Sequence, residues 1–127
     1  MKSLLLAAAA FALTAATASA QDIAAGERSF KKCQPCHAVG PDAPNKIGPE
    51  LNGLDGRKSG SVQNYSYSDA NRQAGITWNE ASFSEYIQSP MQKVPGTKMA
   101  FAGIRNGQEI ANLWAYLKQF KADGSKK

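Results

Sequence analysis

The chain has 127 residues, room for one small domain, and carries 15 Lys and Arg against 10 Asp and Glu, a formal net charge of +5. Its two Cys and one His are too few for a structural zinc site of about four ligands, and they allow at most one disulfide. Beyond the first residues, no segment supplies the roughly 20 consecutive apolar residues of a membrane span. These counts exclude a zinc finger and a disulfide-dense scaffold.

Residues 1–20 have the pattern of an export signal. Lys2 precedes an apolar run over residues 4–13, and Ala18-Ser19-Ala20 matches a small-residue cleavage site. The run is too short to span a membrane, and no stop-transfer pattern follows it. A membrane-anchoring helix is the alternative interpretation. We expect a signal peptide over residues 1–20 that is cleaved after Ala20, which places the domain of residues 21–127 in the periplasm.

The first expected helix covers residues 22–32. Asp22 suits its N-cap, and Ile23, Glu27 and Phe30 recur on one helical face. A short helix over residues 68–74 is also expected. The next main helix covers residues 77–89, because the segment that starts at Thr77 has a capping-box pattern. The proline at position 90 should end this helix.

The last expected helix begins at Asn106 or Gly107 and continues to Asp123-Gly124. Lys118 suits the negative end of its dipole, as does the lysine at position 121. The apolar stripe of this helix consists of Ile110, Leu113, Trp114, Leu117 and Phe120.

Between these helices the chain is rich in Gly and Pro, over residues 39–62 and again over 90–103. Irregular segments of this length are uncommon in a compact domain unless they serve a ligand. Three short helices bury little area, so the fold needs another core element. We therefore expect an all-α fold, with three main helices and long loops that surround a large apolar cofactor.

The segment Cys33-Gln34-Pro35-Cys36-His37 is C-x-x-C-H, the haem attachment pattern. Each Cys sulfur can add to one haem vinyl group, and the next residue, His37, can then ligate the iron. A thioredoxin-like redox motif would need a βαβ pattern that is absent from the sequence. The same residues could also form a simple disulfide or hold zinc. The spacing and the single His favour covalently bound haem.

The second axial ligand decides between an electron carrier and a reactive haem. No second His exists, and the domain has two Met. Met99 lies in a long loop that could cover the far haem face, whereas Met91 directly follows Pro90 and is expected to pack or to be partly exposed. Without ligation by Met99, the iron would have an open position, as in a haem peroxidase or a gas-binding protein.

Further motifs follow in order along the chain. They are G-P-x-L-x-G-L-x-G-R at 48–57, Y-S-Y-S-D-A-N at 65–71, G-I-T-W at 75–78, V-P-G-T-K-M-x-F-A-G-I at 94–104 and L-x-x-Y-L-K at 113–118. With these motifs and the K-C-x-x-C-H segment, residues 22–119 resemble the class I cytochromes c, especially the soluble periplasmic bacterial group related to mitochondrial cytochrome c. The resemblance implies a small cytochrome c fold around one haem c, attached through Cys33 and Cys36.

The resemblance also implies roles for individual residues. His37 and Met99 would be the axial ligands, and the Pro49 carbonyl would accept the His37 Nδ1 proton. Phe101 would pack near the exposed haem edge. Tyr67 and Trp78 would donate hydrogen bonds to a haem propionate, and Arg57 would offset the propionate charge. A polar pocket beside the Met99 sulfur would be formed by Asn71, Tyr86 and Thr97. The helix contact would involve Gly26, Phe30, Leu113 and Tyr116.

A carrier of this kind transfers single electrons by the outer-sphere route, so the chain is not expected to be an enzyme. Its partners would be acidic docking faces, such as those of a quinol-oxidising cytochrome bc complex and a terminal oxidase, reductase or reaction centre. Mitochondrial relatives carry two Lys where this chain has Met91 and Gln92, so the expected positive ring is thinner here. The ring would consist of Lys31, Lys32, Lys46, Lys58, Lys93, Lys98 and Arg105.

Several function classes have weaker support in the sequence. A signalling role, known among mitochondrial relatives, does not suit an exported bacterial protein. Binding to nucleic acid is not expected, because no clustered basic run occurs. A nucleotide loop over residues 48–53 is rejected because Leu54-Asp55 follows it instead of Lys and Ser or Thr. We expect a monomer that meets membranes only through its partners.

Overall fold

The computed structural model describes residues 7–12 and 21–127. The expected cleavage site at residues 18–20 therefore lies outside the described residues. Within the described ranges the regular elements are helices, and β-pairing is limited to two isolated bridges, so the all-α prediction is confirmed. No helix in these ranges is long and apolar enough to cross a membrane. The helices are α1 (Ile23–Phe30), α2 (Asp69–Gln73), α3 (Glu80–Gln88), α4 (Pro90–Lys93) and α5 (Gly107–Leu117).

The first and last helices begin where the sequence predicts. Asp22 is the N-cap of α1, and its carboxylate accepts the Ala25 N–H at 3.0 Å. Asn106 is the N-cap of α5, and its side-chain oxygen accepts the Glu109 N–H at 2.9 Å. Each cap satisfies a backbone donor that has no partner inside the helix. The short helix α2 also matches its prediction and has Ser68 as its N-cap.

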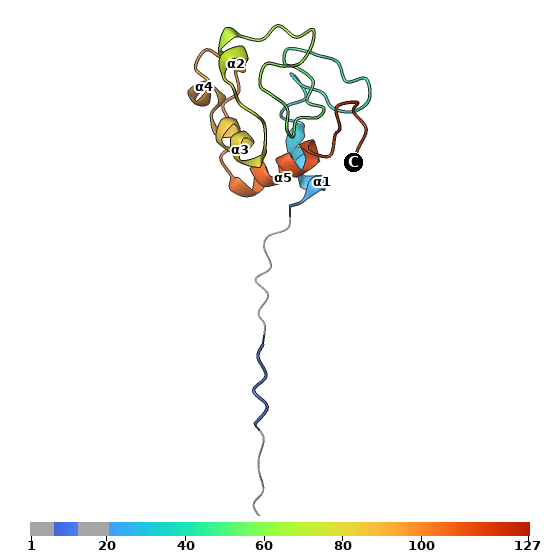
Figure 1. Ribbon diagram of the computed structural model, residues 1–127, viewed down its shortest axis with the longest axis vertical. Coiled ribbons are helices and arrows are strands. Elements are labelled where there is room, and N and C mark those ends of the chain that lie inside the picture. Colours follow the sequence, from blue (N-terminus) through green and yellow to red (C-terminus); the bar gives the residue numbers. More distant parts are fainter. Residues whose placement is uncertain (1–6, 13–20) are drawn as a thin grey trace, which may run out of the picture.

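Helices α1 and α5 pack against each other at the lower side of the globular part (Figure 1). Their backbones approach closely at Gly26, where a Cβ atom would lie 2.0 Å from the carbonyl oxygen of Asn112. The rings of Phe30 and Tyr116 lie beside this crossing, with centroids 5.5 Å apart. The helix contact expected from the sequence is therefore present. Ile23, on the same predicted face, is 45% exposed, so this face is buried only toward its C-terminal end.

Helix α3 begins later than predicted. Its N-cap is Asn79, which exchanges hydrogen bonds with Ser82, so the predicted capping box that starts at Thr77 is wrong. Thr77 instead forms an antiparallel bridge with Lys58, and this bridge holds it in extended backbone. The helix ends at Gln88 with Ser89 as its C-cap, which agrees with the predicted end near Ser89. Pro90 then opens α4, because its fixed φ suits a first helical position, so the segment 90–103 is not wholly irregular.

Helix α5 ends at Leu117, well before the predicted end at residues 123–124. Beyond it the chain folds back: Phe120 forms a bridge with Lys126, and the Phe120 carbonyl accepts the Gly53 N–H at 2.9 Å. Gly124 has a φ of +85°, and a Cβ there would lie 2.2 Å from the Gly40 carbonyl oxygen. Phe120 is buried through this return of the chain and not as part of the helical stripe, and Lys121 lies outside the helix.

Candidate haem-binding site

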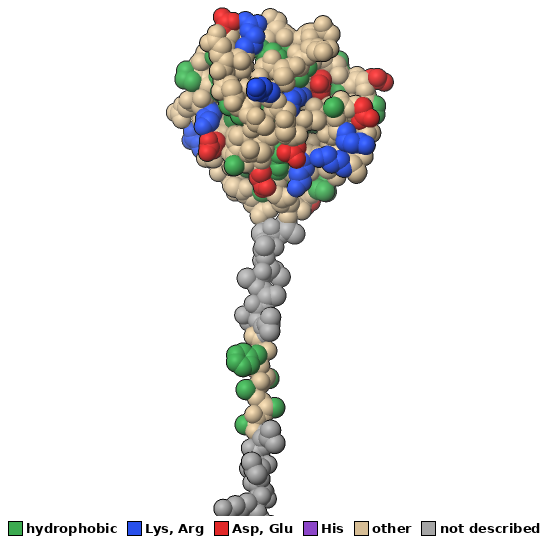
Figure 2. Space-filling model, in the orientation of Figure 1, with side chains coloured by type: hydrophobic (Ala, Val, Ile, Leu, Met, Phe, Trp, Pro, Cys, Tyr) green, Lys and Arg blue, Asp and Glu red, His purple; other side chains and the backbone are tan. Residues whose placement is uncertain are grey.

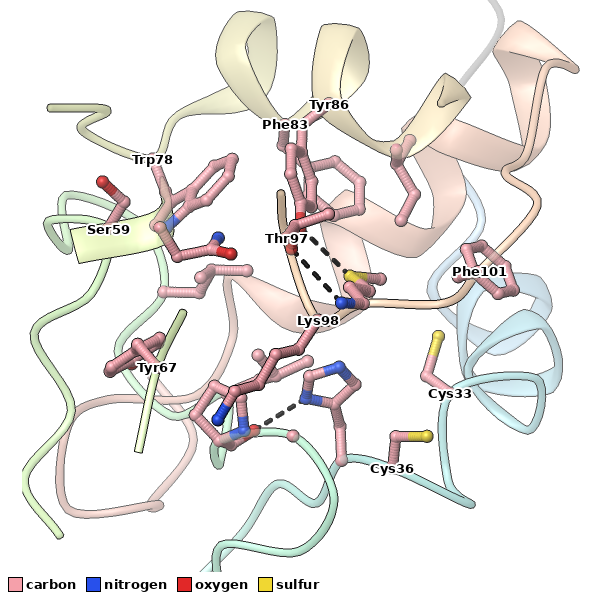
Figure 3. A pocket seen from close by; sticks show the side chains of 18 of the residues that line it. Cys33, Cys36, Ser59, Tyr67, Trp78, Phe83, Tyr86, Thr97, Lys98 and Phe101 are labelled. Atoms are coloured by element: carbon pink, nitrogen blue, oxygen red, sulfur yellow. Dashed lines mark hydrogen bonds between the residues drawn. The ribbon is translucent and has the colours of Figure 1, made fainter. Parts of the chain in front are cut away.

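A large cavity lies between the helices and the long irregular segments. Helices α3 and α5 supply much of its apolar wall, and the loops after α1 and before α5 close the remaining sides. Figure 3 shows Cys33, Cys36 and Phe101 on one side of the cavity and Tyr67 and Trp78 on the other. The apolar part of the lining includes Leu51, Leu54, Phe83, Ile87, Leu113 and Leu117.

The two cysteines are positioned by turns that continue from α1. The Cys33 N–H donates to the Phe30 carbonyl at 2.8 Å, and the His37 N–H donates to the Cys33 carbonyl at 2.8 Å. Both thiols are free and half-buried on the cavity wall. Burial, with the neighbouring Cys36, raises the pKa of the Cys33 thiol to about 11. A thiol with so high a pKa is a poor redox nucleophile, which argues against a thioredoxin-like motif.

His37 is held rigidly in the cavity floor. Its Nδ1–H donates to the Pro49 carbonyl at 2.7 Å, and only 8% of the residue is exposed. The ring lies so close to Gly48 that a Cβ there would be 2.4 Å from the His37 Cε1 atom. Burial lowers the pKa of His37, against the opposing effect of its bond to Pro49, and so favours the neutral imidazole. A neutral ring with Nδ1 engaged has Nε2 left to ligate a metal.

Met99 lies among polar side chains on the same cavity. The Tyr86 hydroxyl donates to the Met99 Sδ atom at 3.3 Å, and the Met99 N–H donates to the Thr97 hydroxyl at 3.2 Å (Figure 3). Asn71 also lines this region, and the side chains of Asn71 and Thr97 both act to lower the pKa of Tyr86. Burial raises the pKa of Tyr86, which therefore stays protonated at neutral pH. The structure thus brings together the pocket expected beside Met99.

Arg57 and Tyr67 present donors to the opposite part of the cavity. The Arg57 Nη1 atom donates to the carbonyls of Glu50 and Asn52, at 2.9 Å each. The Arg57 Nε atom is buried and has no partner within the described residues. Burial lowers the pKa of the guanidinium, and the Glu50 carboxylate opposes this. The Tyr67 hydroxyl accepts the Val62 N–H at 3.0 Å, so its own proton can be donated elsewhere.

Trp78 is buried between this polar region and the Met99 pocket. Its exposed fraction is 8%, and its ring meets the Tyr86 ring edge-on at a centroid distance of 4.9 Å. Its backbone N–H donates to the Arg57 carbonyl at 2.8 Å, which ties the two residues together. All nine residues predicted for the site therefore line one cavity: Cys33, Cys36, His37, Arg57, Tyr67, Asn71, Trp78, Thr97 and Met99.

The residues present fit a haem. Two thiols, an oriented imidazole and a thioether lie on one apolar cavity, and a haem needs these attachment points and axial ligands. The unsatisfied Arg57 Nε suits a buried carboxylate, which is the chemistry of a haem propionate. Sequence reasoning missed Glu50 and Ser59. Ser59 is buried, and its hydroxyl accepts the Ile76 N–H at 3.0 Å. The only sequence signal for Glu50 was its position seven residues before Arg57, in the motif at 48–57.

The basic residues are only partly gathered at the cavity. Lys32, Lys58 and Lys98 line its edge, while the remaining members of the expected ring do not. Lys32 pairs with Glu109, and Lys93 pairs with Glu85 at 2.6 Å. On the face in Figure 2, basic and acidic side chains are interspersed. Met91, at a position where mitochondrial relatives have Lys, is 55% exposed, in line with its expected partial exposure.

Comparison with known proteins identifies the family of the chain. The model of the family described as Cytochrome c matches residues 23–121. Cytochrome c2 of Blastochloris viridis is 57% identical over 116 residues, which cover 91% of each chain. Cytochrome c-550 of Bradyrhizobium diazoefficiens is 64% identical over 101 residues, 80% of this chain and 74% of the relative. The solved structure of cytochrome cH from Methylobacterium extorquens matches with a TM-score of 0.71 and 41% identity, covering 76% of this chain and 97% of that one.

Two thiols and an oriented His at C-x-x-C-H spacing, beside an apolar cavity in an all-α fold, define a c-type cytochrome, and the family match makes the assignment specific. The chain belongs to the cytochrome c family. It is a monohaem electron carrier that binds haem c through Cys33 and Cys36.

Proposed function

We propose that His37 and Met99 would ligate the haem iron from the two sides of the cavity and that the bound haem would supply outer-sphere transfer of single electrons. The observation that carries this proposal is the hydrogen bond from His37 Nδ1 to the Pro49 carbonyl at 2.7 Å, which orients the ring in a cavity that Met99 also lines. A haem with one His and one Met ligand takes up and releases a single electron at a raised potential.

The chain's own residues keep this site rigid. Gly48 packs against the His37 ring, and Thr97 accepts the Met99 N–H, so neither ligand needs to move when the charge of the site changes. Apolar walls exclude water and disfavour the extra positive charge of the oxidised state. Ligation by both His37 and Met99 would leave no iron position open to a substrate. The proposed role is therefore electron transfer without catalysis.

The remaining predicted residues bind and tune the group. Arg57, Tyr67 and Trp78 would hold a propionate, through the unpartnered Arg57 Nε, the free Tyr67 hydroxyl proton and the Trp78 indole N–H. Asn71 and Thr97 would keep the Tyr86 hydroxyl oriented toward the thioether of Met99.

A visible spectrum of the reduced, haem-loaded protein tests the closed iron. We expect a low-spin spectrum that carbon monoxide leaves unchanged at neutral pH, because Met99 occupies the position that the gas requires. A spectrum that shifts at once on addition of the gas would contradict ligation by Met99. It would also favour a peroxidase or gas-binding role.

We propose that the partners are redox complexes with acidic docking faces, among them a quinol-oxidising cytochrome bc complex and an oxidase, reductase or reaction centre. Three exposed lysines at the cavity edge, Lys32, Lys58 and Lys98, support this. Electrostatic attraction of this kind is screened by salt. We expect the second-order rate of electron transfer to such a complex to fall at least about tenfold between 10 mM and 300 mM salt. Stopped-flow measurement of a flat dependence would contradict steering by charge.

We also propose that the carrier works in the periplasm as a monomer and that residues 1–20 are removed on export. The charged start, apolar run and Ala18-Ser19-Ala20 pattern support cleavage before Gln21. An exported protein whose first residue is still Met1 would contradict this.

A further inference from the structure

The Arg57 side chain hydrogen-bonds to the backbone of the preceding loop at residues 50 and 52. Its Nη1 atom donates to two backbone carbonyls, those of Glu50 and Asn52, while its Nε atom remains buried without a partner within the described residues. The guanidinium keeps its charge in proteins, so a full positive charge lies in the cavity wall. The electrostatic effect of this charge on the cavity depends on which negative group lies close enough to offset it.

The compensating group is Glu50. Its carboxylate Oε1 lies 3.8 Å from the Arg57 Nη1 atom, and its Oε2 accepts the Asn52 N–H at 2.6 Å. The side chains of Arg57 and Glu50 are 14% and 22% exposed. In each of the remaining ion pairs of the described residues, at least one side chain is 41% exposed or more. Solvent and salt therefore screen the Arg57–Glu50 pair less than they screen those pairs.

We propose that Glu50 is a positioning residue that lowers the reduction potential by offsetting the charge that Arg57 presents to the haem cavity. The inference rests on the proposed function, in which Arg57 faces a propionate. A negative charge at this place favours the oxidised, more positive state of the site. Its removal therefore raises the potential, because the positive charge of Arg57 is then no longer offset.

The test is the midpoint potential of the haem-loaded protein with Glu50→Gln and Glu50→Asp. The glutamine keeps the length of the side chain and an oxygen that can accept the Asn52 N–H, so the loop should keep its shape. We expect Glu50→Gln to shift the reduction equilibrium about threefold toward the reduced state, which corresponds to about 28 mV for one electron. Glu50→Asp retains the charge and should remain within about 1.3-fold of the parent protein.

Glu85→Gln is the matched control, because it removes the same formal charge from an exposed acid that pairs with Lys93. Its effect should be smaller and should disappear at high ionic strength, while the effect of Glu50→Gln should persist. Equal potentials for the parent and Glu50→Gln would overturn the inference, as would an equal rise for Glu50→Asp. If the parent protein lacks a closed, low-spin spectrum, the proposed function itself fails, and the two failures are thus distinguishable.

Discussion

Replacing Met99 with alanine is expected to open the iron to external ligands. The thioether is the sixth ligand in our proposal. No other His or sulfur can replace it there, because the chain has a single His, both Cys are used for attachment, and Met91 does not line the cavity. The reduced variant should bind carbon monoxide at once. Its midpoint potential should fall by at least about 60 mV, a tenfold change for one electron, because the Met ligand raises the potential.

Met91→Ala provides the control for this experiment. Met91 is 55% exposed and is not among the residues that line the cavity, so its removal should change neither the gas binding nor the potential. The measurements are the visible spectrum of the reduced protein with and without carbon monoxide, and a spectroelectrochemical titration. A Met99→Ala protein that stays closed to the gas at the parent potential would show that a different side chain ligates the iron.

Gly26→Ala is expected to be the most destabilising single-methyl change in the helical core. The added Cβ would lie 2.0 Å from the Asn112 carbonyl oxygen and 2.9 Å from the Tyr116 Cβ, and both belong to the facing helix α5. A backbone oxygen cannot move aside as a flexible side chain can, so α1 and α5 must separate. We expect a loss of about 3 kcal/mol in the free energy of unfolding, measured by guanidinium denaturation.

Gly107→Ala is the matched control, because Gly107 is also helical and no atom would lie within 4 Å of its new Cβ. Alanine has the higher helix propensity, so this variant should equal or slightly exceed the parent in stability. If the two variants unfold at the same denaturant concentration, the close approach at Gly26 contributes nothing.

The sequence predicted the elements whose signals are local. Asp22 and Asn106 cap helices because a short polar side chain before an apolar stripe suits that position. The haem attachment segment at residues 33–37 could also be predicted from the sequence, because covalent attachment of haem requires the C-x-x-C-H spacing. Residue roles at Arg57 and Tyr86 came from the family resemblance and not from any pattern in the residues themselves.

What could not be predicted depends on contacts between distant segments. Thr77 has the right residue type for a helix N-cap, but its bridge with Lys58 holds it in extended backbone before the helix begins. The apolar spacing of Phe120 suits a helix, yet the chain turns there to meet Gly53. Glu50 is one acid among many in the sequence, and only the fold brings its carboxylate to the Arg57 guanidinium.

The pairing of α1 with α5 joins the first and last helices, so everything between them forms one closed loop of chain. The entropic cost of closing a flexible loop grows only with the logarithm of its length, by about 0.6 kcal/mol for each doubling. Added residues in the enclosed segments should therefore cost little stability, provided that the cavity wall is preserved. Because α1 and α5 are far apart in the sequence, folding requires a long-range encounter between them. We therefore expect this small helical protein to fold more slowly than a helical bundle in which each helix packs against its neighbour in sequence.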